Sequence, residues 1–355
     1  MSRGLDLYTP HPPLWRRALA RLYRRLVGGR LFLYERGLAK PRALPVRVVS
    51  VGNLTVGGTG KTPLVMTIAR ELSRRGLRPA VVSRGYRGRG RAAVNVVSDG
   101  ARVLLGPAEA GDEPYLLARS LPGVPVLTGR DRYLAGLAAV EDFGAGTIVL
   151  DDGFQHIQLA RNADLLLLDA RRPWGNGFLL PAGPLREPPE QAARATAFVL
   201  TRAGGGESAT EEELRARFPG RPVFTARRRP VRLTDLAGTT EMEPGWLRGR
   251  RVVAFCGLAR PEAFLETLAG LGVRETLLIK WPDHYRPRDR DLRLIEAKVR
   301  ELGADGAVTT AKDAVKLAGR SLGNGPARPF EAFVLEVEME ITGRADDFLR
   351  HVTGE

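Results

Sequence analysis

The sequence predicts an α/β protein in which a parallel sheet surrounds a phosphate-binding loop and helices cover both faces of the sheet. A second, smaller α/β lobe is predicted to follow. Three observations support this fold. Apolar runs alternate with helical segments from residue 46 onward, and the runs are nearly continuous, as strands buried on both faces require. The first run also enters a glycine-rich turn that ends in Gly60, Lys61 and Thr62 and continues as a helix.

The predicted elements follow one another along the chain with short loops. In the first half, strands are expected at 46–53, 79–86, 124–129, 147–156, 163–170 and 196–203, with helices at 62–76, 111–121 and 130–144. After a short helix at 211–218 and an extended basic stretch at 224–236, strands are expected at 251–258, 275–281, 307–310 and 329–341, with helices at 261–272, 289–303 and 312–319 and a short one at the end of the chain. This pattern predicts three parts, at residues 1–30, 31–230 and 231–355.

Composition limits the possible classes of protein. The chain has 355 residues, 43% of them apolar, and its single cysteine, Cys256, excludes a disulfide framework and fits a reducing cytoplasm. No stretch approaches the roughly 20 apolar residues of a membrane span, and no signal peptide is visible. A net charge of +15 suits anionic partners, but an arginine-preferring genome produces the same excess, so charge alone decides nothing.

Residues 14–27 form a predicted amphipathic helix with a basic face and no acidic residue. Its apolar residues recur at helical spacing, while the other face carries five arginines. Such a helix can lie on an anionic membrane, or it can pack against its own domain. The helix alone leaves both interpretations open.

The glycine-rich segment predicts a nucleotide site. Glycines let the backbone approach a phosphate, the lysine can reach the β- and γ-phosphates, and the threonine hydroxyl can ligate Mg²⁺. The usual pattern begins with a glycine, and Thr55 stands at that position. The predicted nucleotide-binding residues are Thr55, Gly57, Gly58, Thr59, Gly60, Lys61 and Thr62.

Carboxylates follow the strand at 147–156 and begin the helix at 111–121. Mg²⁺ prefers hard oxygen ligands, so Asp151 and Asp152 are predicted metal ligands together with Thr62 and Glu113, although Asp-Gly is also a common turn pair. Asp112 and Glu113 also suit the positive end of a helix for purely electrostatic reasons. Spacing alone leaves the histidines as weak candidates for catalysis.

Eight motifs taken together resemble the tetraacyldisaccharide 4'-kinase family. They are VGNLTVGGTGKTP, SRGY, GDEP, LDDGFQH, LPAGPLREP, FCGLARPEAF, WPDHY and TTAKDAVKL, and they occur in order from about residue 44 to 318. The family's loop reads T-x-G-G-T-G-K-T, so Thr55 fits it. The resemblance implies that ATP and Mg²⁺ serve to phosphorylate the 4'-hydroxyl of the tetraacyl disaccharide 1-phosphate precursor of lipid A. It also implies that the enzyme acts at the cytoplasmic face of the inner membrane, to which the N-terminal helix attaches it.

The resemblance further implies roles for particular residues. Asp112 and His284 match the family's catalytic dyad, in which the histidine polarises the aspartate that orients the sugar hydroxyl. The motifs that line the same cleft contribute Arg132, Gln155, His156, Arg186 and Glu187 as predicted substrate residues.

Two other classes of protein fit parts of this pattern. A switch ATPase of the partitioning or metal-insertion class uses a similar loop, but it usually carries a lysine where this chain has Val56, or a cysteine pair. A nucleic-acid-binding ATPase would interleave basic with aromatic residues, and only 6% of residues are aromatic, so no nucleic-acid partner is predicted.

Overall fold

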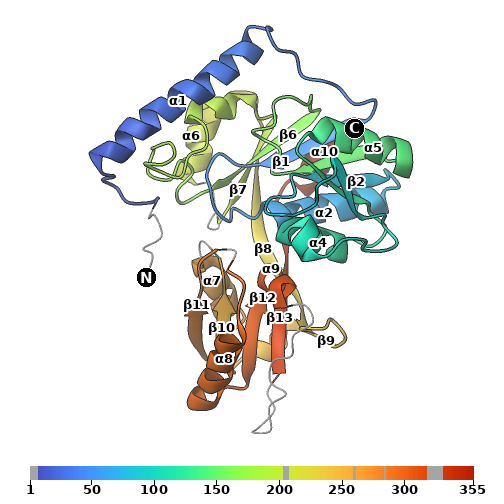
Figure 1. Ribbon diagram of the computed structural model, residues 1–355. Coiled ribbons are helices and arrows are strands. Elements are labelled where there is room, and N and C mark those ends of the chain that lie inside the picture. Colours follow the sequence, from blue (N-terminus) through green and yellow to red (C-terminus); the bar gives the residue numbers. More distant parts are fainter. Residues whose placement is uncertain (1–6, 203–207, 259–260, 284, 318–330) are drawn as a thin grey trace. The chain divides into compact units, whose positions relative to one another are not determined.

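The computed structural model describes residues 7–202, 208–258, 261–283, 285–317 and 331–355 (Figure 1). The chain forms two compact units: unit 1 contains residues 1–227 and 339–355, and unit 2 contains residues 228–338. The sequence predicted a division near residue 230. However, it assigned the end of the chain to the second lobe, whereas residues 339–355 belong to unit 1.

Unit 1 is built on a sheet whose central strand, β1, leads into the glycine-rich loop. The strands lie in the order β3 (Val94–Ser98), β4 (Val126–Gly129), β2 (Pro79–Ser83), β5 (Thr147–Asp151), β1 (Arg47–Gly52), β6 (Ala163–Asp169), β7 (Ala197–Thr201) and β8 (Val223–Asp235). All neighbours are parallel except β3 and β4. Strand β3 was not predicted from the sequence. Its apolar run is short and lies at the edge of the sheet, where the hydrophobic signal is weak.

Helices cover both faces of this sheet, as the sequence predicted. The helical elements of unit 1 are α1 (Leu14–Glu35), α2 (Lys61–Arg74), α3 (Pro107–Ala110), α4 (Asp112–Ser120), α5 (Arg132–Phe143), the 3₁₀ helix η1 (Pro189–Arg194), α6 (Ala209–Arg217) and α10 (Ala345–Thr353). In β1, Val49 and Val51 pack in the core with α2, α4 and α10, while Val48 packs in the core with α5. Successive strand residues point to opposite faces, so each buried strand contributes to two cores.

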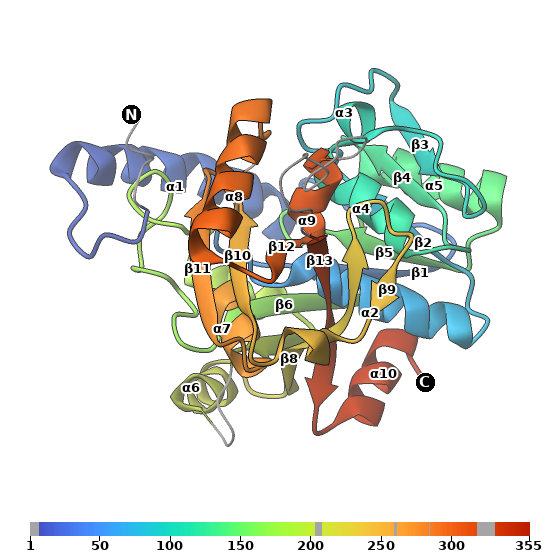
Figure 2. The ribbon, with the colours of Figure 1, turned by 90° about the horizontal axis from the view of Figure 1, so that it is seen from below.

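The last helix, α10, completes one of these cores. Phe348 and Val352 on α10 are each only 1% exposed and pack in the same cluster as Ile68 of α2. Figures 1 and 2 both show α10 beside α2. Local periodicity predicts the helix but not the unit that it joins, because that depends on the direction in which the preceding strand runs.

Unit 2 is a smaller α/β sandwich. Its strands β11 (Glu275–Lys280), β10 (Arg251–Cys256), β12 (Gly306–Thr310) and β13 (Glu331–Thr342) are parallel, and β9 (Glu241–Met242) is antiparallel to β8. The helical elements are η2 (Pro244–Leu247), α7 (Glu262–Gly270), α8 (Asp289–Leu302), α9 (Ala311–Ala314) and η3 (Val315–Leu317). Alternate residues of β10 pack toward α7 and toward α8. Strands β8 and β13 both continue from one unit into the other.

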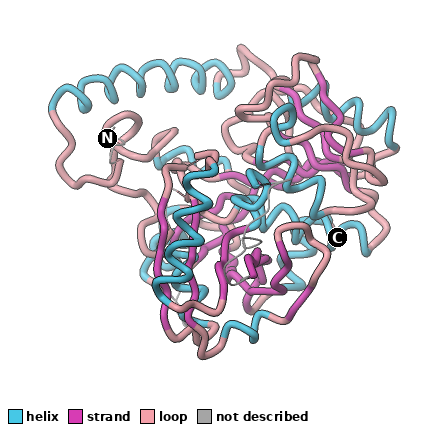
Figure 3. Tube along the Cα trace, turned by 60° about the horizontal axis from the view of Figure 1, so that its bottom comes forward, coloured by secondary structure: helices cyan, strands magenta, loops and turns pink. Residues whose placement is uncertain are grey.

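Helix α1 lies at the periphery of unit 1 (Figures 1 and 3) and has two apolar faces. Ala20, Tyr23 and Leu31 lie on one face: Ala20 and Leu31 are buried, and Ala20 and Tyr23 pack in a core of unit 1. The other face carries large apolar side chains that are 47–68% exposed, at Trp15, Leu19, Leu22 and Leu26. Both sets of side chains recur at helical spacing, so the sequence predicted a single apolar face. The structure shows two faces, one buried against unit 1 and one exposed.

Candidate active site

The glycine-rich loop connects β1 to α2 and opens onto the start of that helix. Gly57 and Gly60 have φ values of +118° and +96°, a region in which side chains with a Cβ atom are strained. Around Gly58, a Cβ atom would meet nothing within 4 Å, so one side of the loop is open. Because α2 begins at Lys61, its first N–H groups lie next to this opening. The loop therefore has the features of an anion-binding helix start.

Lys61 is held over the loop by a buried asparagine. Its Nζ donates to Asn53 Oδ1 at 3.0 Å and lies 3.5 Å from Asp152 Oδ1. Asn53 is fully buried, and its Nδ2 donates to the carbonyl oxygen of Thr55 at 2.6 Å. The lysine side chain remains 13% exposed. The ammonium is thus fixed near the loop and still accessible to an anionic ligand.

The two aspartates at the end of β5 lie in different electrostatic environments. Burial favours protonation of Asp152, but Lys61 and Arg186 outweigh it and lower the pKa of its carboxyl, which accepts hydrogen bonds from Arg186 Nη1 at 2.9 and 2.7 Å. Asp151 is 1% exposed, and burial, with repulsion from Glu113 and Asp152, raises its pKa to about 7. A bound cation would favour the ionised form of Asp151.

Four buried polar atoms near this edge of the sheet have no hydrogen-bond partner within the described part of the chain. They are Thr59 Oγ1, Asp151 Oδ1, Arg132 Nε and His156 Nε2. Native proteins leave few buried polar groups unsatisfied, because each one costs about 1–3 kcal/mol. A ligand, an ion or water bound at this edge would supply partners for these atoms.

Arg132 and His156 contribute one charged and one neutral group. Arg132 begins α5 after the capping residue Asp131 and is 7% exposed; burial, reinforced by the charge of Arg84, lowers its pKa to about 10. Burial, followed by repulsion from Arg132, lowers the pKa of His156 to about 4. At neutral pH the guanidinium is therefore charged and the imidazole is not.

Gln155 and Arg186 belong to the same hydrogen-bond network as Lys61. Arg186 Nη1 donates to Gln155 Oε1 at 3.2 Å, and Gln155 Nε2 donates to the carbonyl oxygen of Asn53 at 2.9 Å. Glu187 differs, because it is 3% exposed and its Oε2 accepts a hydrogen bond from Arg194 Nη2 at 2.5 Å. Its carboxylate is already paired within the protein, and its role toward substrate stays a prediction.

A resident metal centre is not evident in the described residues. There, no group of three or more His, Cys, Asp and Glu side chains is arranged to hold a metal ion. Glu113, Asp151 and Asp152 are near enough for repulsion but do not form such a group. Mg²⁺ that arrives with a nucleotide needs only one or two carboxylates, with phosphate oxygens and water as its other ligands. The buried, unpartnered Oδ1 of Asp151 fits that requirement.

Asp112 is the first residue of α4 and is 9% exposed. The preceding Gly111 has φ +93°, and a Cβ atom there would lie 2.6 Å from the carbonyl oxygen of Tyr86. The GDEP turn therefore packs directly on the SRGY segment at the end of β2. The predicted partner of Asp112, His284, lies outside the described residues, so the dyad stays a prediction.

Sequence reasoning missed two charged or polar residues of this site. Asn53 directly follows β1, and Arg84 directly follows β2. The rule that selected Asp151 would have found both, because the carboxyl ends of parallel strands form the binding edge of such sheets.

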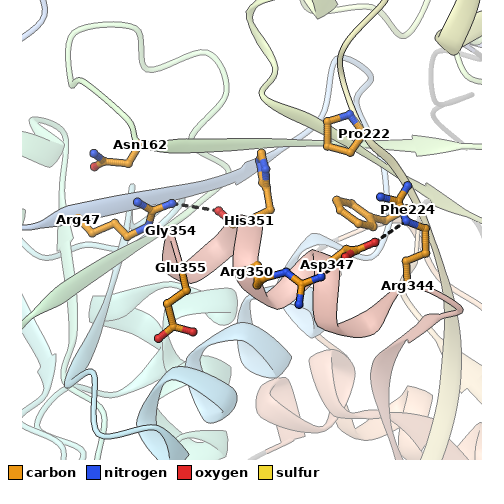
Figure 4. Close-up of a pocket in the computed structure, with 10 residues that line it drawn as sticks. All are labelled: Arg47, Asn162, Pro222, Phe224, Arg344, Asp347, Arg350, His351, Gly354 and Glu355. Carbon is orange, nitrogen blue, oxygen red and sulfur yellow. Dashed lines mark hydrogen bonds and ion pairs between the residues drawn. The ribbon is translucent and has the colours of Figure 1, made fainter.

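A separate cavity of about 430 Å³ lies at the opposite edge of this sheet (Figure 4). Arg47, Asn162 and Pro222, at or just before the starts of β1, β6 and β8, line one part of it, and α10 lines another. Arg47 donates to the carbonyl oxygens of His351 (3.0 Å) and Val352 (2.6 Å), at the end of that helix. None of the predicted site residues lines this cavity, and ligands bind such sheets at the carboxyl edge.

Comparisons with known proteins agree with this geometry. The family model described as tetraacyldisaccharide-1-P 4'-kinase matches residues 14–354. The chain belongs to this family. It is similar to the tetraacyldisaccharide 4'-kinase of Syntrophus aciditrophicus, at 49% identity over 80% of this chain and 79% of the relative. The enzyme of the same description from Anaeromyxobacter dehalogenans (strain 2CP-C) is also 49% identical, over 80% of this chain and 76% of the relative.

A solved structure extends the likeness to the fold. The crystal structure of LpxK from Aquifex aeolicus in complex with ATP matches with a TM-score of 0.73 and 33% identity, over 95% of this chain and 97% of that chain. Membership of the tetraacyldisaccharide-1-P 4'-kinase family confirms the α/β fold, the kinase function in lipid A biosynthesis and the use of ATP that the sequence predicted.

Proposed function

We propose that this chain transfers the γ-phosphate of ATP to the 4'-hydroxyl of the tetraacyl disaccharide 1-phosphate through the site at the carboxyl edge of unit 1. The observation that supports this most directly is the position of Lys61 at the start of α2, 3.0 Å from Asn53 and 3.5 Å from Asp152. When a nucleotide binds, its phosphates replace the aspartate as the partner of the ammonium. Loop N–H groups and Lys61 then stabilise the charge that develops during phosphoryl transfer.

Residues at the end of β5 would hold Mg²⁺ with the nucleotide. We assign the metal contact to Asp151 and Thr62, with Glu113 and Asp152 close enough to add negative charge. A bound Mg²⁺ neutralises phosphate charge and orients the phosphates for in-line attack. Asp152 would then chiefly hold Arg186, which donates to its carboxylate. Arg186, Arg132, Gln155, His156 and Glu187 are the proposed substrate-side residues.

Asp112 is the proposed acceptor for the hydrogen bond of the sugar hydroxyl. The start of α4 favours its ionised form, because the helix dipole is positive there. His284 is the proposed partner that orients Asp112 and takes up the proton, a contribution typically worth about 10²–10⁴-fold.

A double-mutant cycle tests the dyad. Asp112→Asn and His284→Ala should each lower kcat sharply with ATP affinity nearly unchanged, and the double variant should lose little more than the worse single variant. Losses that multiply in the double variant, or a His284→Ala enzyme that differs only in KM for the lipid, would remove the dyad from the mechanism.

The exposed apolar face of α1 is the proposed attachment to the cytoplasmic face of the inner membrane. Trp15, Leu19, Leu22 and Leu26 are 47–68% exposed on one face, and arginines on the same helix can contact anionic lipid. No helix in the described ranges is long and apolar enough to cross a bilayer. We propose that α1 lies in the membrane interface with its exposed apolar face toward the lipid.

Replacing the exposed stripe tests this attachment without removing the helix. The triple variant Leu19→Gln, Leu22→Gln and Leu26→Gln should sediment less with anionic vesicles while keeping its activity on detergent-dispersed substrate. Wild-type binding should weaken as salt rises. Replacing Leu294, which is 44% exposed on α8, is the matched control for the loss of an exposed leucine. Unchanged sedimentation of the triple variant would refute the proposed attachment.

A further inference from the structure

The N-terminal segment makes three hydrogen bonds to main-chain atoms of the proposed site. Tyr8 Oη donates to the carbonyl oxygen of Val56 at 3.0 Å, and Tyr23 Oη donates to that of Arg186 at 3.0 Å. Arg30 Nη2 donates to the carbonyl oxygen of Gln155, also at 3.0 Å. One bond thus reaches the glycine-rich loop, and the other two reach residues of the Lys61 network. The N-terminal segment that carries the proposed membrane-binding face therefore also contacts the backbone of the proposed active site.

The bond from Tyr8 fixes the orientation of one peptide group in the loop. The carbonyl of Val56 and the N–H of Gly57 belong to the same peptide, which is planar and trans, so they point in opposite directions. When Tyr8 holds the carbonyl oxygen on one side, the N–H of Gly57 is directed to the other side. Gly57 has φ +118°, a conformation that glycine can leave easily because it lacks a Cβ atom. This peptide would rotate readily without an external partner.

Other contacts hold both members of this hydrogen bond in place. On the loop side, the N–H of Val56 donates to the carbonyl oxygen of Pro184 at 2.8 Å. On the tyrosine side, Asn176 Nδ2 donates to the carbonyl oxygen of Thr9, also at 2.8 Å. The ring of Tyr8 is half-buried, and its Cε1 lies 3.6 Å from the position that a Cβ atom on Gly175 would take. These contacts place the phenol beside the loop.

We propose that Tyr8 is a positioning residue for ATP phosphate binding, because it directs the N–H of Gly57 toward the phosphates. This inference rests on the proposed function of the glycine-rich loop. It gives the residues before α1 a role in nucleotide affinity that is distinct from membrane attachment. Since loop N–H groups bind the phosphates before and during transfer, the effect falls on the ATP side of the reaction.

The test compares Tyr8, whose hydroxyl donates to the loop, with a tyrosine elsewhere on the N-terminal segment. Tyr8→Phe keeps the ring and removes the hydroxyl. Tyr34→Phe, on α1, is the matched control, since the hydroxyl of Tyr34 makes none of the three bonds to the site. For each full-length variant, the binding of Mg-ATP is titrated alone, and kcat and KM for both substrates are measured in detergent. Thermal unfolding and vesicle sedimentation complete the comparison.

We expect Tyr8→Phe to weaken Mg-ATP binding and kcat/KM for ATP about three- to tenfold, the loss typical of one hydrogen bond. KM for the lipid, the unfolding temperature and vesicle binding should equal those of Tyr34→Phe and of the wild type. Equal ATP parameters in both variants would overturn the proposal, as would a loss of stability with equal losses toward both substrates. A wild-type protein that binds no Mg-ATP would instead refute the proposed function of the loop.

Discussion

Both units place a lysine close to an aspartate in segments that follow strands of the parallel sheet, but the two pairs have different surroundings. In unit 1, Lys61 is 13% exposed, and the neighbouring motifs contain buried atoms without partners. In unit 2, the side chain of Lys316 is fully buried, and its Nζ lies 2.7 Å from Asp313 Oδ1. Asp313 is also held by Thr310, whose hydroxyl donates to its Oδ2 at 2.8 Å.

This difference shows how a site for a ligand differs from an ion pair that supports the fold. Charges that are fully paired within the protein have no need of a ligand. Lys61 and its neighbours, in contrast, leave polar atoms that a ligand can contact. We therefore expect replacement of Lys61 to reduce catalysis and replacement of Lys316 to reduce stability.

The largest expected effect is on catalysis at Lys61. Lys61→Ala should lower kcat/KM by at least about 10²–10³-fold, because a fixed charge at the transferring phosphate is lost. Its unfolding transition should stay near that of the wild type. Lys298→Ala, on the surface of α8, is the control for removing a lysine. A folded Lys61→Ala enzyme with near-normal turnover would show that the loop is not the nucleotide site.

The matching effect in unit 2 is on stability. Lys316→Met should lower the free energy of unfolding by about 3–5 kcal/mol, because it leaves Asp313 charged and buried without its partner. The double variant Lys316→Met with Asp313→Leu should recover most of that loss. Urea unfolding measures both, with Lys298→Met as the surface control. A single variant as stable as the wild type would show that this pair is solvated in solution.

Within unit 1, the two aspartates at the end of β5 also differ in whether their oxygens have partners inside the protein. Asp151→Asn should raise the Mg²⁺ concentration needed for half-maximal activity about tenfold, because it removes the carboxylate with an unpartnered oxygen. Asp152→Asn should lower kcat with a smaller change in the Mg²⁺ requirement, since Arg186 loses the carboxylate that holds it. Unchanged Mg²⁺ titrations in both variants would contradict the metal assignment.

The smallest expected effect concerns a partly buried histidine far from the site. His351 contacts Thr196 Oγ1 through Nε2 at 2.8 Å, and burial, with repulsion from Arg47 and Arg221, lowers its pKa below 6.5. The unfolded chain therefore takes up this proton first as pH falls, so the free energy of unfolding decreases below about pH 6.5. His351→Gln should reduce that decrease by less than about 1 kcal/mol, since the ring is only partly buried. Urea unfolding of the wild type and the variant at pH 7 and pH 5 measures this difference. The same loss of unfolding free energy in both proteins would contradict the prediction.

The fold also explains the basic stretch at 224–236. The basic stretch at 224–236 became β8, where Arg227 pairs with Glu340 at 2.7 Å and Arg229 pairs with Glu338 at 3.1 Å. Arg232 pairs with Glu336 at 2.9 Å. These arginines face glutamates of β13, so they do not indicate an anionic partner. The sequence pattern showed the basic residues but not the acidic strand that neutralises them.

Local patterns in the sequence determined most elements of the fold and the edge of the sheet at which the site lies. The alternation of apolar runs with helical stripes predicted the central strands of unit 1. The glycines before Lys61 and the aspartates after β5 marked that edge, because the carboxyl ends of parallel strands meet there. These signals are local, so spacing along the chain is sufficient to read them.

Only the tertiary structure decided which of these residues meet. It separated the two apolar faces of α1, returned α10 to unit 1 and joined Asn53 to Lys61. It also brought Tyr8 to Val56, 48 residues along the chain. Periodicity reports which face of an element is apolar, but not which partner covers it. Contacts between distant residues depend on how several elements pack together, and that information is spread over the whole chain.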